Sequence, residues 1–121
     1  MIKEEKLTYQ IRSCVYEVYR ELGHGFLEKV YENALLIELK SKELACKCQV
    51  PLEVKYKNKQ VGQYFADLIV EDRVIIEVKA QDKLTGAAEA QLLNYMRISG
   101  LTVGLLVNFT YPKATVKRLV L

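Results

Sequence analysis

GQYFADLIVEDRVIIEVKA, residues 62–80, is the stretch of sequence that decides the fold. Two runs of strand-forming residues, 60–70 and 74–80, flank the polar triplet Glu71-Asp72-Arg73. A connection this short between two strands predicts an antiparallel hairpin. Charged residues interrupt both runs, Asp67 in the first strand and Glu77 and Lys79 in the second. Because these strands are otherwise apolar, the charges need a partner that offsets the cost of their burial.

The hairpin register indicates what that partner is. Alternation along the second strand puts Ile75, Glu77 and Lys79 on one face, and the tight connection sets Asp67 close to Glu77. Two carboxylates at this range repel each other, and a divalent cation removes the conflict. Oxygen ligands suit Mg²⁺ or Mn²⁺. Lys79 is then placed to polarise a water molecule or to balance charge on a phosphate.

The sequence on either side of the hairpin predicts a mixed α/β protein. Apolar residues at helical spacing predict two N-terminal helices, and a third helix precedes an apolar strand of the kind covered on both faces. A helix that crosses between the third and fourth strands indicates that these strands are parallel. The expected elements are helices at 5–22, 27–44 and 86–99 and strands at 48–57, 60–70, 74–80, 102–109 and 115–121, in the order α-α-β-β-β-α-β-β.

Composition sets limits on the class of protein. The chain has 121 residues, of which 50% are hydrophobic, so we expect a single domain over residues 1–121. No apolar run approaches the ~20 residues of a membrane span, and the charged start lacks the apolar core of a signal peptide. We therefore expect a cytoplasmic protein that does not associate with membranes. The three cysteines do not have zinc-site spacing and are interpreted as free thiols.

Asp67 followed by Glu77-Val78-Lys79 resembles the signature of the PD-(D/E)XK nuclease superfamily, with Ala66 in place of the usual proline. A salt-bridged surface strand is the alternative reading of this short pattern. Gln91 and Tyr95, four residues apart on the third predicted helix, resemble the Gln-x-x-x-Tyr motif of the RecB-like and lambda-exonuclease-like branch. That resemblance implies that both side chains lie beside the metal and position the DNA backbone.

A second motif, Gly25-x-x-Glu28-x-x-Tyr31, matches the signature of the GxxExxY proteins, which are grouped with the same superfamily. In related nucleases a glutamate of the N-terminal helix completes the acidic cluster, and the resemblance assigns that role to Glu28. Its spacing from Tyr31 and Leu35 indicates that it shares part of the inward face of its helix. His24 is a further candidate metal ligand, and a solvated loop histidine is the alternative.

Together the resemblances imply a restriction-endonuclease-like fold, a mixed central sheet flanked by helices. They also imply a hydrolase that cleaves phosphodiester bonds in DNA. Glu28, Asp67, Glu77 and the backbone carbonyl of Val78 would bind one or two Mg²⁺ or Mn²⁺ ions, with Lys79 assisting the attacking water. Two alternatives stay open: a non-catalytic nucleic-acid-binding or regulatory module that keeps this fold, and a structural protein whose acids and lysine form an ion-pair network.

Charge adds one candidate surface. The net charge of +3 is mild, but Lys55, Lys57 and Lys59 form a basic stretch. It is interpreted either as a set of DNA phosphate contacts or as an ordinary solvated face. The sequence leaves open whether the substrate is DNA or RNA, paired or unpaired. It predicts no added specificity domain, which leaves targeting to a partner protein or to a homodimer.

Overall fold

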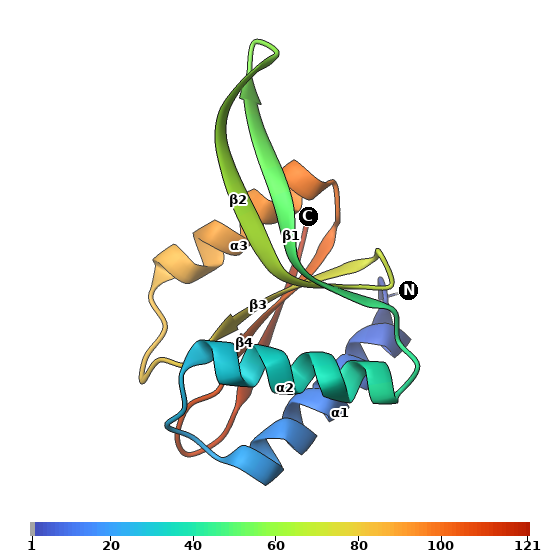
Figure 1. The fold of residues 1–121 in the computed structure, drawn as a ribbon, viewed down its shortest axis with the longest axis vertical. Helices are drawn as coiled ribbons and strands as arrows, with labels where there is room; N and C mark the ends of the chain where they lie inside the picture. Colours follow the sequence, from blue (N-terminus) through green and yellow to red (C-terminus); the bar gives the residue numbers. More distant parts are fainter. Residues whose placement is uncertain (1) are drawn as a thin grey trace.

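The structure, a computed structural model, describes residues 2–121 and has helices on both faces of a single sheet (Figure 1). The helices are α1 (Glu5–Leu22), α2 (Glu28–Ser41) and α3 (Gly86–Ser99). The strands are β1 (Cys46–Tyr56), β2 (Lys59–Val70), β3 (Val74–Lys79), β4 (Val103–Asn108) and β5 (Thr115–Val120). The predicted order α-α-β-β-β-α-β-β is therefore confirmed.

The sheet has the strand order β1-β2-β3-β4-β5. Strands β3 and β4 are parallel, whereas the other neighbours are antiparallel, as predicted from the helix that crosses between β3 and β4. Strand β5 lies at an edge of the sheet. The sheet is thus the mixed central sheet expected from the sequence.

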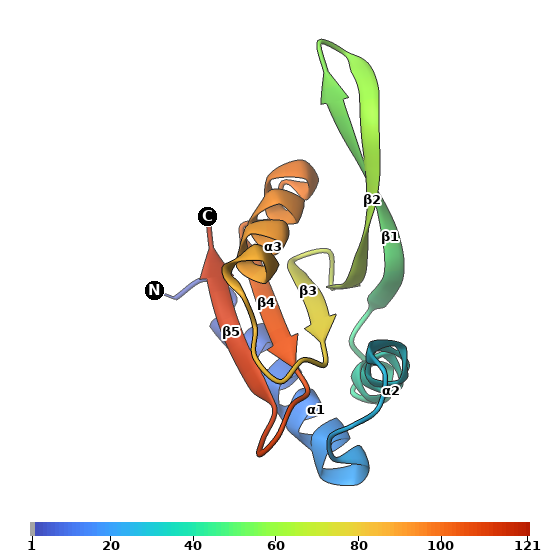
Figure 2. The same cartoon turned by 90° about the vertical axis from the view of Figure 1, so that its left-hand side faces the viewer.

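Helices cover the two faces of the sheet (Figure 2), and each face has its own hydrophobic cluster. Helices α1 and α2 pack on one face, where Leu68, Ile76 and Leu105 are fully buried. Helix α3 packs on the other face, against Ile75 and Leu106. Alternate residues of β3 therefore enter opposite cores, and Glu77 lies on the α3 face with Ile75.

Helix α3 is held tightly against β4 at Gly104. A Cβ at this glycine would lie 2.7 Å from the Met96 sulfur and 3.3 Å from the Leu92 side chain, closer than ordinary packing allows. Glycine is thus the residue that permits this approach. The close approach fixes the height of α3 above the sheet, and with it the position of the side chains that α3 presents to β3.

The β1–β2 hairpin extends beyond the body of the molecule as an arm (Figure 1). The two strands pair from Cys46↔Val70 to Tyr56↔Lys59, whereas β3 is only 6 residues long. Lys57 and Asn58 form the turn with positive φ angles of 48° and 65°, the combination that a two-residue hairpin turn requires. Among residues 2–121, none of the helices combines the length and the apolar character of a membrane span.

Candidate active site

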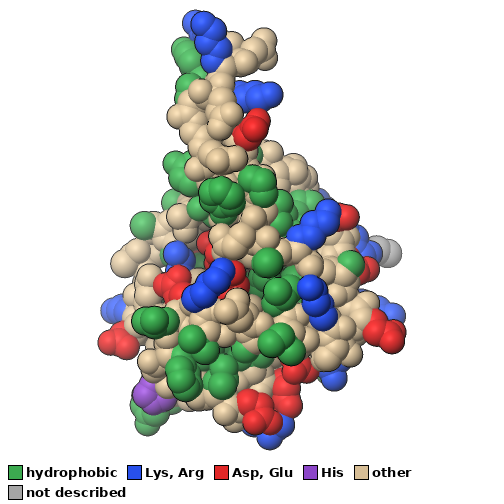
Figure 3. Space-filling view, viewed as in Figure 1, with side chains coloured by type: hydrophobic (Ala, Val, Ile, Leu, Met, Phe, Trp, Pro, Cys, Tyr) green, Lys and Arg blue, Asp and Glu red, His purple; other side chains and the backbone are tan. Residues whose placement is uncertain are grey.

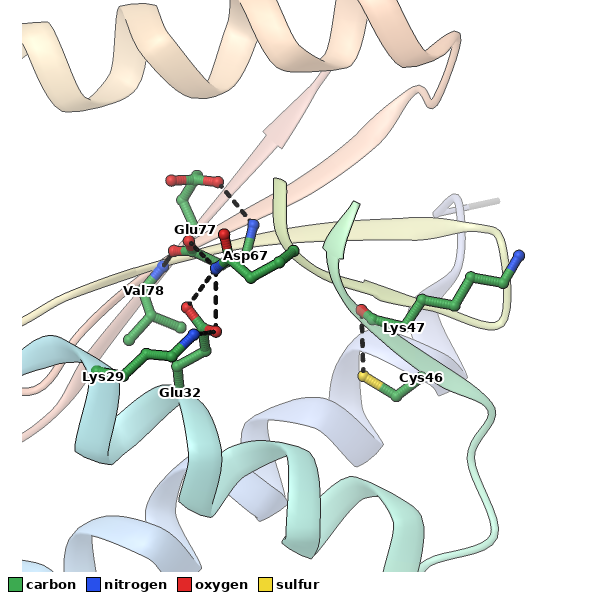
Figure 4. Close-up of polar contacts among 8 residues, drawn as sticks. Lys29, Glu32, Cys46, Lys47, Asp67, Glu77 and Val78 are labelled. Carbon is green, nitrogen blue, oxygen red and sulfur yellow. Dashed lines mark hydrogen bonds and ion pairs between the residues drawn. The ribbon is translucent and has the colours of Figure 1, made fainter. Parts of the chain in front are cut away.

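The β2–β3 ladder stops where the acidic residues begin. Paired residues run from Val70↔Val74 to Leu68↔Ile76, so Asp67 and Glu77 would form the next pair. Instead, each side chain accepts a hydrogen bond from the backbone of the opposite strand (Figure 4). The Val78 amide donates to Asp67 Oδ2 at 2.8 Å, and the Asp67 amide donates to Glu77 Oε1 at 3.3 Å. The two strands thus stop pairing at Asp67 of β2 and Glu77 of β3. We call this place, where each strand carries one carboxylate, the fork.

Burial makes this pair of acids electrostatically unfavourable. Glu77 is only 4% exposed, and Asp67 is half-buried. Burial, followed by repulsion from Asp67, raises the pKa of Glu77 to about 8, although Lys79 opposes the shift. Burial also raises the pKa of Asp67 to about 6; the Val78 amide opposes this shift and the Glu32 carboxylate adds to it. The fork therefore favours a bound cation or retained protons.

Lys79 does not neutralise the pair by direct contact. Its ammonium donates a hydrogen bond of 3.3 Å to Gln91 Oε1 on α3. Within residues 2–121, none of the salt bridges shorter than 4.0 Å involves Asp67, Glu77 or Lys79. This geometry does not match an ion-pair network, in which the lysine would bind the acids directly.

Helix α3 brings both of its predicted site residues to the fork. Gln91 bonds Lys79, and the two side chains line a cavity of about 220 Å³. Tyr95 is 5% exposed and stacks at an angle on Tyr64 of β2, with ring centroids 5.5 Å apart. Burial, then the negative charges of Glu77 and Asp67, raise the pKa of Tyr95. Its phenol therefore lies within electrostatic range of both acids and stays protonated near neutral pH.

The α2 carboxylate that faces this region is Glu32, and the inward position expected for Glu28 is wrong. Glu28 is the first residue of α2 and is exposed, whereas Glu32, one turn later, is 5% exposed. Glu32 binds Lys29 at 2.8 Å and accepts hydrogen bonds of 3.0 Å from Gln49. Leu27, just before Glu28, is 79% exposed, so the start of α2 lies at the surface.

Gln49 joins Glu32 to the fork, an arrangement that the sequence alone does not predict. Its amide donates to both Glu32 oxygens at 3.0 Å and reaches Asp67 Oδ1 at 3.4 Å. Cys48↔Leu68 and Val50↔Ala66 are paired, so Gln49 lies opposite Asp67. One amide thus spans two carboxylates that would otherwise repel.

His24 lies elsewhere in the structure. Its imidazole packs against Tyr111, with ring centroids 5.0 Å apart and planes at 61°, in the loop between α1 and α2. No hydrogen bond to His24 is found within residues 2–121. As a metal ligand, His24 therefore stays an untested prediction without support from its neighbours.

The donors at the fork fit a hard cation with few protein ligands. Within residues 2–121, no three side chains of His, Cys, Asp or Glu lie close enough to hold one metal ion together. Asp67 and Glu77, with backbone carbonyl groups, are the donors at the fork, and Gln49 bonds Glu32 beside them. Mg²⁺ is commonly bound through one or two carboxylates while it keeps several waters, whereas a structural Zn²⁺ needs four ligands. The donor set thus fits Mg²⁺ or Mn²⁺.

Comparisons with known proteins bear on the fold and on the family. The fold is similar to that of the solved structure described as "Crystal structure of SSO0001", with a TM-score of 0.61 and 21% sequence identity. The match covers 97% of this chain and 59% of the other, so this chain spans somewhat more than half of that protein. No curated protein matches this chain. A family model described as the PD-(D/E)XK nuclease superfamily matches residues 5–119. The chain therefore belongs to the PD-(D/E)XK nuclease superfamily.

Proposed function

We propose that this protein is a Mg²⁺- or Mn²⁺-dependent nuclease that hydrolyses phosphodiester bonds in DNA. The observation that carries the proposal is the fork, where Asp67 and Glu77 each bind the backbone of the opposite strand and lie beside Lys79 without an ion pair. Buried acids with raised pKa values are typical of functional sites. The motif Gly25-x-x-Glu28-x-x-Tyr31 supports membership of the GxxExxY group, and the pair Gln91 and Tyr95 supports the RecB-like branch.

The side chains around the fork divide the chemistry between them. Asp67, Glu77 and the Val78 carbonyl would hold the metal ion, which supplies a polarised water and charge neutralisation when bound. The Lys79 ammonium faces charge that develops on the phosphate and donates hydrogen bonds to the incoming water oxygen. Gln91 fixes the direction of the Lys79 side chain through their hydrogen bond. The protonated Tyr95 hydroxyl is a donor for a phosphate oxygen.

Glu32, and not Glu28, is the helix carboxylate expected to support this site. Replacing Glu32 with Gln removes the charge next to Asp67 and one of the two acceptors for Gln49, so cleavage should fall at least ~10-fold. Glu28→Gln is the matched control, because it makes the same chemical change one turn earlier at an exposed position. Its cleavage rate should stay within about twofold of the parent's. Steady-state cleavage assays decide the point, and a larger loss in Glu28→Gln would return the supporting role to Glu28.

The arm offers a surface for a polyanion. Basic side chains lie near its tip in Figure 3, beside an acidic one, and Lys55, Lys57 and Lys59 of the arm are all exposed. Exposed ammonium groups release counterions from DNA when they contact phosphates, which gives binding its salt dependence. The arm is therefore the region where we expect sequence-independent contact with the DNA backbone.

Replacing Lys55, Lys57 and Lys59 together with Gln should weaken DNA binding and flatten its salt dependence. The slope of log K against log salt should fall by about one unit for each phosphate that the arm no longer neutralises. The control is the same change at Lys3, Lys6 and Lys40, three exposed lysines with the same total charge. Fluorescence anisotropy across a salt series measures both slopes. Equal slopes for the two triple variants would assign the arm lysines to an ordinary solvated surface.

A cleavage panel tests the proposed function as a whole. DNA and RNA substrates, each as single strands, duplexes and branched forms, are incubated with Mg²⁺, Mn²⁺ or EDTA. The proposal expects cleavage of DNA that requires the metal and disappears in EDTA. Binding of DNA without cleavage in any metal would support a non-catalytic module instead. Cleavage that persists in EDTA would overturn the metal-dependent assignment.

A further inference from the structure

A second cavity, of about 260 Å³, opens at the carboxyl ends of the parallel strands β3 and β4. Three connecting segments meet there: the α1–α2 loop, the β3–α3 loop and the β4–β5 loop, at the lower left of Figure 1. Its lining includes the aromatic side chains of His24, Phe26 and Tyr111 and the polar side chains of Gln81 and Asp82. None of these five residues belongs to the fork.

The walls of this cavity are anchored to the protein core. The Tyr31 hydroxyl donates to the Gly23 carbonyl at 2.7 Å and accepts from the Phe26 amide at 3.2 Å, which fixes the α1–α2 loop. The Tyr31 ring stacks on Phe109, with centroids 4.4 Å apart and planes within 4°. Gly25 has a φ of +104°, a conformation that a side chain would strain. The glycine and tyrosine of the Gly25-x-x-Glu28-x-x-Tyr31 motif therefore shape this wall.

The opposite wall is equally constrained. Asn108 is 3% exposed and forms two hydrogen bonds of 2.9 Å with the backbone of Gln81, one as acceptor from the amide and one as donor to the carbonyl. This pairing fixes the chain immediately after β3. The Gln81 side chain lines both this cavity and the cavity beside Lys79 and Gln91. The two cavities are thus neighbours on either side of Gln81.

The side chains that line the cavity are better suited to a nucleobase than to a phosphate group. No lysine or arginine is found among the described residues that line the cavity, and Asp82 contributes a carboxylate, so a phosphate is disfavoured. Aromatic rings stack on bases, and amide and carboxylate groups bond base edges. The volume lies below the ~300–1,000 Å³ of cavities for drug-sized ligands, which limits the occupant to a single ring system.

We propose that this cavity binds one unstacked nucleobase of the substrate, next to the phosphodiester bond held at the fork. The proposal rests on the proposed nuclease function and deepens it, because a base can enter only when it leaves the duplex. Lys79 and Gln81 are two residues apart, at most about 7 Å along the chain, so the base and the scissile phosphate belong to neighbouring nucleotides. The substrate class is therefore a strand with unpaired nucleotides at the cleavage position.

The experiment compares two tyrosines with the same exposure. Tyr111 lies in the cavity and Tyr9 lies on α1, and each is 71% exposed. Tyr111→Ala should weaken binding of a 12-nucleotide single-stranded DNA about 10-fold, because stacking on one base contributes ~1–3 kcal/mol. Tyr9→Ala should change it less than twofold, and Tyr111→Phe should restore it. Affinities are measured by fluorescence anisotropy in EDTA and again with Ca²⁺, with thermal melts to verify folding.

Oligonucleotides with one abasic position, moved stepwise along the strand, provide a second measurement. At the position that enters the cavity, loss of the base should weaken binding to the parent about 10-fold and barely affect Tyr111→Ala. A parent that binds and cleaves DNA while Tyr111→Ala keeps its full affinity would overturn the base site alone. A parent that neither binds nor cleaves any nucleic acid would overturn the base site and the proposed function together.

Discussion

Replacing Asp67 with Asn or Glu77 with Gln is expected to lower DNA cleavage by at least ~100-fold. Each change keeps the shape of the side chain and removes the negative charge that a divalent cation needs. Loss of one well-placed electrostatic group in an active site typically costs two to three orders of magnitude. Cleavage of the best substrate from the panel, with saturating Mg²⁺, measures the effect. Lys79→Met should lose activity to a similar extent, because the ammonium next to the phosphate is gone.

These losses must be separated from unfolding. Asn and Gln still accept the backbone hydrogen bonds from Val78 and from Asp67, so the fork keeps its geometry in both acid variants. In EDTA the variants should melt at the temperature of the parent or above it. The exposed variant Glu28→Gln serves as the active control. Full activity in either acid variant would exclude a metal-dependent role for that carboxylate.

The second large effect concerns stability as a function of pH. Without metal, the protein should lose stability as the pH rises from about 4 to about 8, because the pKa of Asp67 is raised to about 6 and that of Glu77 to about 8. Both pKa values lie above those of the unfolded chain, so the folded state retains protons that the unfolded state releases. The stability contribution is complete below the unfolded pKa values and disappears as the pH passes the folded ones.

The double variant Asp67→Asn, Glu77→Gln isolates this contribution. Its melting temperature in EDTA should exceed the parent's by at least ~5 °C at pH 8, and the difference should shrink towards pH 5. About 1 kcal/mol corresponds to ~4 °C in a protein of this size. Differential scanning fluorimetry at several pH values measures the difference. An ion-pair network predicts the reverse, since loss of the acids would leave the half-buried Lys79 unpaired and lower the melting temperature.

Mg²⁺ completes the comparison. A ligand that binds only the folded state raises stability, by ~2.7 kcal/mol when its concentration is 100 times its Kd. Mg²⁺ should therefore raise the melting temperature of the parent at pH 8 and leave the double variant almost unchanged. An equal rise in both proteins would show that the ion binds away from the fork.

The central hairpin was predictable because all its information is local. Three residues between two strands set the register, and that register predicted Asp67 close to Glu77; in the structure the Asp67 amide donates to the Glu77 carboxylate. The ranges predicted for the first and third helices, 5–22 and 86–99, agree with α1 and α3. The end of the ladder at Leu68↔Ile76 was not predictable, since an unbroken ladder fits the same residues.

The α2 glutamate that lies near Asp67 and Glu77 could not be identified from the local sequence pattern. Glu28 precedes Tyr31 and Leu35 by three and seven residues, and Glu32 precedes Leu35 and Leu39 by the same intervals. Periodicity alone therefore cannot separate the two glutamates. The two glutamates differ in their position along α2: Glu28 is its first residue, whereas Glu32 lies one turn later and contacts Gln49 of β1. Gln49 was missed for a related reason, because its neighbour Asp67 is set by the register between β1 and β2.

The arm has a consequence for how proteins of this shape diversify. Among the described residues, those at positions 53–63 belong to neither hydrophobic cluster, so their side chains do not help to keep the body folded. Mutations in this part of the arm therefore have little effect on the stability of the fold, whereas mutations at the fork affect the proposed active site. The tip can therefore lengthen, change charge or acquire new binding groups one substitution at a time. Descendants of one ancestor could in this way adopt different targets while the chemistry beneath the arm is inherited intact.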